Sequence, residues 1–199
     1  MLRPPWIGQD EDGAPPVPFP APPMLKINPD DLAAALAGGG QPTPEQSLRA
    51  AQACDDLLDA EIAAGRPVLV ETVLSSDKLQ RRVLAAKAAG YAVALVYVTL
   101  RHEALNVARV ALRRAQGGHG VPPDRVLDRR ARSHGRFAWF AERADFVAVF
   151  ENSAEPVCAA MKRGARWWLW RLDLLPHDLA AAVDAAAGRG PGEAAPPPS

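Results

Sequence analysis

Two groups of polar residues have types and spacing that could support phosphate chemistry. Residues 71–75 read Glu-Thr-Val-Leu-Ser, so a carboxylate and two hydroxyls follow a short apolar run. Further along the chain, a Gly-Gly-His-Gly-Val-Pro segment at 117–122 precedes several arginines. A carboxylate can deprotonate an attacking hydroxyl, and guanidinium groups on a glycine-hinged segment can neutralise a transferring phosphoryl group. The pattern is therefore typical of phosphoryl transfer beneath an arginine lid.

The arginines on both sides of this glycine segment share helix faces in pairs. Arg109 and Arg113 are four residues apart, and Arg129 and Arg132 are three apart, so each pair projects from one face of a helix. Such planar forks could clamp the phosphates of a nucleotide. The alternative interpretation is a solvated basic helix face, which is the commoner fate of a run of like charges.

The composition indicates one globular domain. The chain has 199 residues, 48% of them hydrophobic, with 23 basic and 23 acidic residues. The resulting net charge of zero argues against nucleic acid or an anionic membrane as a partner. The two cysteines, Cys54 and Cys158, predict neither a disulfide framework nor a zinc site. Because no apolar run approaches the roughly 20 residues that span a bilayer and no signal peptide is evident, we expect a cytoplasmic location.

Both ends of the chain are rich in proline, alanine and glycine. Residues 1–23 and 188–199 lack the periodicity that would let them bury a face, so we expect both segments to be disordered. The folded domain is then expected to cover residues 24–187.

Strand and helix patterns alternate within that domain. Helices are expected at 32–37, between a cap at Thr43 and a stop at Gly65, from Ser76 to Gly90, and at 103–115; strands are expected at 67–71, 92–99, 146–150 and 167–172. The strand at 92–99 is apolar at almost every position and should be covered on both faces. The alternation predicts an α/β fold with a doubly wound, mostly parallel sheet. Ligands of such folds bind at the carboxyl ends of strands, where Glu71, Thr99 and residues 151–153 fall.

Several sequence blocks, in this order and spacing, resemble the zeta-toxin family of P-loop kinases, relatives of UDP-N-acetylglucosamine kinases. The blocks are residues 28–31 (NPDD), 71–75 (ETVLS), 85–91 (AAKAAGY), 109–110 (RV), 117–122 (GGHGVP), Arg129, 132–133 (RS) and 150–153 (FENS). The resemblance covers about Ile27 to Ser153. It implies a P-loop kinase fold, ATP and Mg²⁺ as cofactors, a small hydroxyl-bearing substrate such as a nucleotide sugar, and an antitoxin as a candidate protein partner.

The resemblance also implies roles for acceptor-side residues. Asp30 lies where the family has a carboxylate beside the acceptor hydroxyl, so it is the candidate general base or magnesium partner. Glu71 would contact the acceptor, with Thr72 and Ser75 as neighbouring hydroxyl donors. The alternatives are that Asp30 caps the short helix after it, and that Ser75 or Ser76 caps the next helix.

The phosphate-side roles fall on the arginines. Arg109 and Arg129 match the family pattern and are the candidate catalytic arginines, with Arg113 and Arg132 as further nucleotide-binding residues. Arg130 stands where relatives usually carry a tyrosine.

One element that the resemblance requires is missing. P-loop kinases hold the triphosphate with a G-x-x-x-x-G-K-[ST] loop after a central strand, and no such string occurs in this sequence. We therefore expect weak or absent phosphate transfer and a sheet with an unfilled centre. One explanation is that residues 1–23 are translated out of frame, since their codons, read one base later, permit a phosphate loop. The other is a catalytically inactive relic that binds a nucleotide sugar or a protein.

Overall fold

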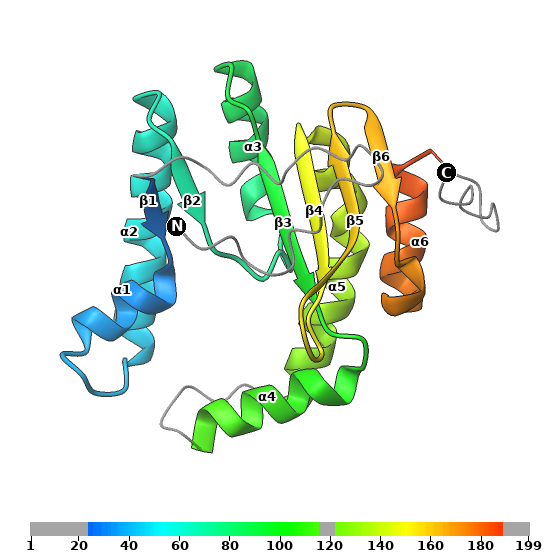
Figure 1. The fold of residues 1–199 in the computed structure, drawn as a ribbon. Coiled ribbons are helices and arrows are strands. Elements are labelled where there is room, and N and C mark those ends of the chain that lie inside the picture. The colour runs from blue at the N-terminus through cyan, green and yellow to red at the C-terminus, as the bar shows by residue number, and fades with distance from the viewer. Residues whose placement is uncertain (1–23, 116–121, 189–199) are drawn as a thin grey trace, which may run out of the picture.

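The computed structural model describes residues 24–115 and 122–188, which form helices packed against two sheets (Figure 1). The strands are β1 (Leu25–Ile27), β2 (Val68–Val70), β3 (Ala94–Thr99), β4 (Phe146–Glu151), β5 (Val157–Arg163) and β6 (Arg166–Leu169). The helices are α1 (Pro29–Leu36), α2 (Pro44–Ala63), α3 (Lys78–Ala88), α4 (Glu103–Ala115), α5 (Pro123–Arg143) and α6 (His177–Ala186), with a 3-10 turn, η1 (Leu172–Leu174). The alternating order confirms the predicted α/β class.

The smaller sheet pairs β1 with β2 in parallel, with Ile27 opposite Val70. The side chains of Ile27, Val68 and Val70 pack around Cys54 and Leu58 of helix α2. Because each strand has only three residues, most of this apolar contact comes from the helix. We call β1, α1, α2 and β2 the small lobe.

The larger sheet has the order β3-β4-β5-β6. β3 and β4 are parallel, whereas β5 and β6 extend the sheet in antiparallel fashion. One face of this sheet packs on α5 and α6, where Phe137, Leu179 and Val183 are fully buried against Tyr97 and Val149. This cluster is the main core, and we call the part from β3 to α6 the large lobe.

The two sheets are not hydrogen-bonded to each other, and among the described residues no strand lies between β2 and β3. β2 and β3 run in the same direction and form the facing edges of the sheets (Figure 1). This arrangement agrees with the expectation of an unfilled centre. The sequence also predicted a mostly parallel sheet, and the strand pairs β1-β2 and β3-β4 are parallel.

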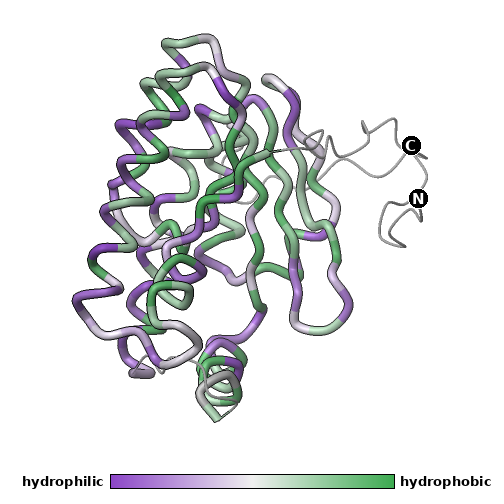
Figure 2. The backbone as a smooth tube through the Cα atoms, turned by 90° about the vertical axis from the view of Figure 1, so that its left-hand side faces the viewer, coloured by the Kyte–Doolittle hydropathy of each residue, from purple (hydrophilic) through white to green (hydrophobic). Residues whose placement is uncertain are grey.

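The main helices lie on one side of the strands, as the side view shows (Figure 2). On the opposite side, Leu69 of β2 is 48% exposed, and Val96 and Val98 of β3 are 50% and 56% exposed. The prediction that the strand at 92–99 is covered on both faces is therefore wrong. The apolar side chains on its second face are typical of a strand covered by a helix, but no helix of the described residues packs there.

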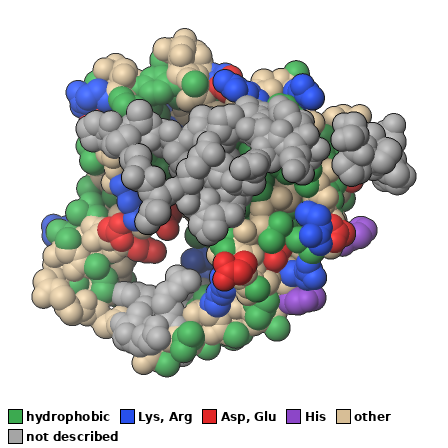
Figure 3. Space-filling view, in the orientation of Figure 1, with side chains coloured by type: hydrophobic (Ala, Val, Ile, Leu, Met, Phe, Trp, Pro, Cys, Tyr) green, Lys and Arg blue, Asp and Glu red, His purple; other side chains and the backbone are tan. Residues whose placement is uncertain are grey.

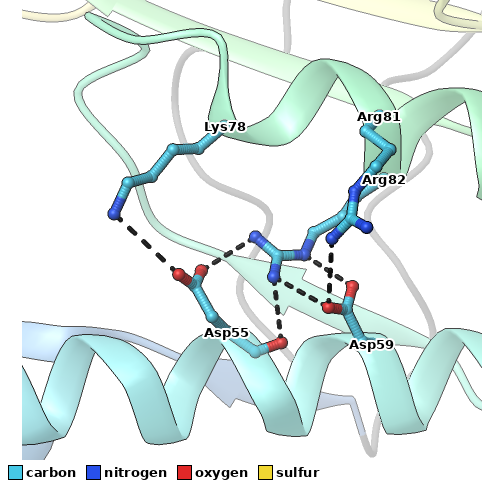
Figure 4. A network of polar contacts seen from close by, with 5 residues as sticks. All are labelled: Asp55, Asp59, Lys78, Arg81 and Arg82. Atoms are coloured by element: carbon cyan, nitrogen blue, oxygen red, sulfur yellow. Dashed lines mark hydrogen bonds and ion pairs between the residues drawn. The ribbon is translucent and has the colours of Figure 1, made fainter.

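A cluster of charges joins helix α3 to helix α2 of the small lobe (Figure 4). The guanidinium of Arg82 is 2.7 Å from Asp59 Oδ1 and 2.8 Å from Asp55 Oδ1, and its Nη2 also donates to the backbone oxygen of Asp55. Lys78 and Arg81 contact the same two carboxylates at 3.9 and 3.6 Å. The hydrogen bonds from Arg82 lower the pKa of Asp59 and outweigh the opposing effect of burial.

The start of α2 was predicted correctly, whereas α1 begins at Pro29 and not at the predicted residue 32. The expected capping box is present, because Thr43 Oγ1 accepts from Gln46 N and Gln46 Oε1 accepts from Thr43 N. Helix α4 has the predicted bounds, whereas the strand expected at 167–172 is β6 followed by η1. The sequence analysis missed β1, β5 and α6. Its predictions of disorder at 1–23 and at 188–199, apart from Gly188, and of a glycine hinge at 117–121 lie outside the described residues.

Candidate functional site

The carboxyl ends of β1 and β2 bring together four polar residues from two segments that are distant in sequence. Asn28 Nδ2 donates to Glu71 Oε2 at 2.9 Å, and the backbone N–H of Glu71 donates to Ile27 O at 3.2 Å. Lys26 Nζ lies 3.0 Å from Glu71 Oε2 and 3.0 Å from Asp31 Oδ2. These hydrogen bonds, first that to Glu71, raise the pKa of Lys26. The strand ends therefore present a fixed carboxylate beside the start of α1, and we call Lys26, Asn28, Asp31 and Glu71 the strand-end cluster.

Asp30 lies next to this cluster, in the first turn of α1. Its backbone N–H donates to Asn28 Oδ1 at 2.9 Å, so Asn28 is the capping residue of α1. The alternative that Asp30 caps this helix is therefore wrong. The side chain of Asp30 is exposed, which leaves its carboxylate accessible to a ligand.

The hydroxyl residues after Glu71 belong to a tight connection to α3. Thr72 Oγ1 accepts from the backbone N–H of Leu74 at 3.2 Å, and Leu74 adopts the left-handed backbone conformation with a φ of 57°. Ser75 is half-buried. The alternative that Ser75 or Ser76 caps the next helix is wrong, because α3 begins at Lys78 with Asp77 at its N-cap position.

The carboxyl ends of β3 and β4 form the facing side of the candidate site. Glu151 is buried and accepts from the backbone N–H groups of Arg101 at 3.0 Å and Ser153 at 2.8 Å. Burial opposes ionisation of Glu151, but the hydrogen bonds from Ser153 and Arg101 outweigh it and hold its pKa below the usual range. Asn152 N also donates to Thr99 O at 2.9 Å, so the two strand tips are fixed to each other.

Two of the predicted arginines reach these strand tips or the helix beside them. Arg109 is exposed and its Nη2 donates to Asn152 O at 2.7 Å. Arg130 is buried and donates to Leu100 O at 2.9 Å and to Asn106 Oδ1 at 3.1 Å. Arg130 therefore anchors the start of α4, a structural role that leaves its guanidinium largely occupied.

The other arginines are placed differently. Arg129 is exposed on α5, and Arg132 forms an exposed ion pair with Asp128 at 2.9 Å, the arrangement of a solvated helix face. The side chain of Arg113 lies outside the described residues. The structure thus brings Arg109 to the strand tips and places Arg132 in a surface pair.

The space-filling view shows how the two sides relate (Figure 3). A hollow opens on this face of the molecule, with acidic side chains gathered on one side and basic together with acidic side chains on the other. The acidic side lies over the small lobe and the mixed side over the large lobe. A ligand in the hollow would therefore meet acidic side chains on one side and both basic and acidic side chains on the other.

Sequence reasoning missed a buried polar cluster beneath β3. His134 Nδ1 is 2.7 Å from Asp178 Oδ2, and its Nε2 is 3.5 Å from Thr99 Oγ1. Tyr97 Oη is 2.7 Å from Ser133 Oγ. Burial lowers the pKa of His134 despite the nearby Asp178 carboxylate, and burial raises the pKa of Tyr97 to about 12. Helix α6, which carries Asp178, was not predicted, so the pairing could not be foreseen.

A sequence model of one protein family matches this chain. The family is described as an AAA domain, and the match covers residues 19–137. The chain belongs to this AAA domain family. The family is of the P-loop NTPase and kinase type, so the chain is related to nucleotide-binding proteins. No curated protein and no solved structure matches the chain.

The described residues do not fit ATP and Mg²⁺ as a complete site. The helix that starts at the end of β1 carries Asp30 and Asp31 in its first turn, and these negative charges oppose phosphate binding at its N-terminus. The turn between β3 and α4 has no glycine, and no phosphate-loop string occurs in the sequence. Within residues 24–115 and 122–188, no three His, Cys, Asp or Glu side chains gather to hold a metal ion. In the same residues, no helix is long and apolar enough to cross a membrane.

Proposed function

We propose that this chain carries the acceptor side and the arginine lid of a small-molecule kinase of zeta-toxin type, and that phosphate transfer by the polypeptide as it stands is weak or absent. The observation that supports the acceptor side is the 2.9 Å bond from Asn28 to Glu71, which joins the ends of β1 and β2 beside the exposed Asp30. The family match supports the P-loop kinase type.

The residues of the acceptor side can perform distinct steps. Glu71 is oriented by Asn28 and Lys26, so one of its oxygens is held while the carboxylate can still accept from a sugar hydroxyl. Asp30 can take the proton of an acceptor hydroxyl that lies within hydrogen-bond reach. Arg109 of α4, which donates to Asn152 O just after β4, would neutralise negative charge on a bound ligand.

Binding of UDP-N-acetylglucosamine, measured by titration calorimetry, tests this proposal. We expect saturable binding that Glu71→Gln weakens about tenfold, which corresponds to roughly 1.4 kcal/mol. Glu45→Gln is the matched control, because Glu45 is an exposed glutamate paired only at 3.8 Å with Arg49 on α2. If binding is not saturable, or if Glu71→Gln and Glu45→Gln bind equally well, the proposed acceptor site is wrong.

The inactive relic is the second candidate, and the lack of a phosphate-loop string in the sequence favours it. The relic would bind the sugar nucleotide without ATP. A titration with ATP and Mg²⁺ separates the two functions: saturable binding that Arg109→Ala abolishes supports the kinase, and binding of the sugar nucleotide alone supports the relic.

A further inference from the structure

We propose that the open position between β2 and β3 belongs to a strand, loop and helix that this polypeptide lacks as written, and that the codons of residues 1–23, read one base later, encode the loop and the helix. The inference rests on the proposed function only where it identifies the loop as a phosphate-binding loop. The place of the missing unit follows from the edges, faces and connections of the two sheets.

The backbone of β3 has an edge without a partner strand in the described chain. The carbonyls of Val93 and Thr99 accept from residues in and beside β4, at 2.8 and 2.9 Å. Residues of a parallel strand alternate between their two neighbours, so the N–H and C=O groups of Val96 and Val98 point to the other side. Just after β2, the backbone N–H of Glu71 donates to Ile27 O and so faces β1. By the same alternation, the backbone N–H and C=O groups of residues 68 and 70 point away from β1. Because β2 and β3 run in the same direction, one parallel strand could pair with both edges.

Exposed apolar side chains lie on one face of the sheets, in the two strands β2 and β3 that flank the open position. The opposite faces share a continuous helix layer, because Leu79 of α3 packs against the cores of both lobes. Leu69, Val96 and Val98 therefore point to the same free side, each about half exposed. Inner parallel strands are normally covered on both faces. A helix above the open position would cover all three side chains.

The connections predict which side that helix must take. From β1 to β2, β2 to β3 and β3 to β4, the chain moves across the sheets in one direction, with its helices on one side (Figures 1 and 2). Crossovers between parallel strands are right-handed in nearly all proteins. A strand between β2 and β3 that precedes β1 must cross in the opposite direction, so its helix must lie on the opposite, bare side.

The length of chain before β1 suits this path. Codons 11–23 could encode a helix of 13 residues, which at 1.5 Å per residue is about 20 Å long. β3 has six residues, and at 3.3 Å per residue it is also about 20 Å long. The helix would thus run from the carboxyl end of the new strand back to the start of β1. The strand itself would be encoded upstream of codon 3.

The codons permit the loop that this position would need. Gln9 and Asp10 are encoded as CAR and GAY, and read one base later these bases give codons for lysine or arginine and then threonine or methionine. The same shift turns Trp6, Ile7 and Gly8 into codons that can read Gly-Ser-Gly, and codon 3 can become glycine. The result, Gly-x-x-Gly-Ser-Gly-Lys-Thr, is a phosphate loop, whose N–H groups and lysine bind phosphates. It would lie at the carboxyl end of the new strand, beside the strand-end cluster.

The nucleotide sequence is the first test. We expect the shifted frame to read Gly-Ser-Gly-Lys-Thr over codons 6–10, an open reading frame with a strand pattern upstream, and one inserted or deleted base before codon 24. A shifted frame that contains a stop codon or lacks lysine over codon 9 overturns the inference.

Hydrogen exchange on the present chain and on the frame-restored chain is the second test. In the present chain we expect the amides of Val96 and Val98 to exchange at least tenfold faster than those of Leu95 and Tyr97, which face β4. In the restored chain we expect this difference to vanish. Protected Val96 and Val98 amides in the present chain overturn the inference. If these amides are protected and light scattering gives the mass of a dimer, a second copy of the chain occupies the open position.

The outcomes separate this inference from the proposed function. A restored chain whose Val96 and Val98 amides become protected supports the missing unit even if neither ATP with Mg²⁺ nor UDP-N-acetylglucosamine binds, and the kinase proposal then fails alone. A folded restored chain in which these amides remain unprotected overturns the inference, whatever it binds.

Discussion

The small lobe and the large lobe are stabilised in different ways. The large lobe has four paired strands and a core in which Phe137, Val147 and Leu179 are fully buried. The small lobe has two strands of three residues each, and it is joined to α3 through the charges around Arg82. The contact between α3 and the small lobe therefore combines these ion pairs with the apolar packing of Leu79. We conclude that the large lobe folds as the scaffold and the small lobe depends on it.

Loss of the central aromatic side chain should have the largest effect on this comparison. Phe137→Ala removes a fully buried ring that packs edge-on against Tyr97 at 5.1 Å, and we expect it to lower the free energy of unfolding by about 3–5 kcal/mol. Urea denaturation measures the loss. Leu112→Ala, at a side chain that is 60% exposed, is the control and should change stability by less than about 0.5 kcal/mol. If the small lobe of Phe137→Ala unfolds at the same urea concentration as in the unsubstituted protein, the small lobe does not depend on the large lobe.

Loss of the charged link should affect the small lobe selectively. Arg82→Leu leaves Asp55 and Asp59 without their main partner, and because both carboxylates are partly exposed we expect a loss of about 2 kcal/mol. Hydrogen exchange should rise at residues 68–70 and stay unchanged at Val147 and Val149. Arg81→Leu is the matched control, since its side chain is 81% exposed and touches Asp59 only at 3.6 Å. Equal effects of the two substitutions would show that the buried guanidinium is not the link.

Acid should weaken the large lobe through His134. Burial lowers the pKa of His134 in the folded protein, so below the ordinary value of 6.5 the unfolded chain binds a proton that the folded chain resists. The free energy of unfolding should therefore fall as the pH decreases from about 6.5 towards the lower folded pKa. His134→Gln should flatten this dependence in urea titrations between pH 7.5 and 5. The groups that face the ring are Asp178, Arg130 and Glu103, and a steeper slope in the variant would assign the effect to one of them.

The smallest effect is expected at the helix cap of the small lobe. Thr43→Ala removes the hydroxyl that accepts from Gln46 N, and the loss should be about 1 kcal/mol. Thr43→Ser keeps the hydroxyl and is the control. A thermal melt that is unchanged for Thr43→Ala would show that tertiary packing alone holds the start of α2.

Local sequence signals predicted much of the fold. The capping box at Thr43 and the bounds of α4 follow from interactions within one or two helical turns, which is why they could be read directly. An asparagine before Pro29 is likewise a helix-start signal, and it could have identified Asn28 as the cap of α1. β5 escaped prediction because its centre contains Ala159 and Ala160, which have weak preference for strands.

The candidate site was less predictable, because its contacts join distant segments. Glu71 could be placed at a strand end from pattern alone, and Asp30 was identified only through the family resemblance. The bond from Asn28 to Glu71 spans 43 residues and depends on the pairing of β1 with β2. The pair of His134 and Asp178 spans 44 residues and requires helix α6. Whether Asp30, Arg109 and Arg129 act on one ligand remains a prediction.

The position of Arg130 limits how an arginine lid could move. Its guanidinium ties α5 to the backbone of Leu100 and to the side chain of Asn106 in the first turn of α4. These bonds hold the first turn of α4 against α5 at a point about two turns into α5. A rigid swing of α4 away from α5 would therefore have to break the bond between Arg130 and Asn106.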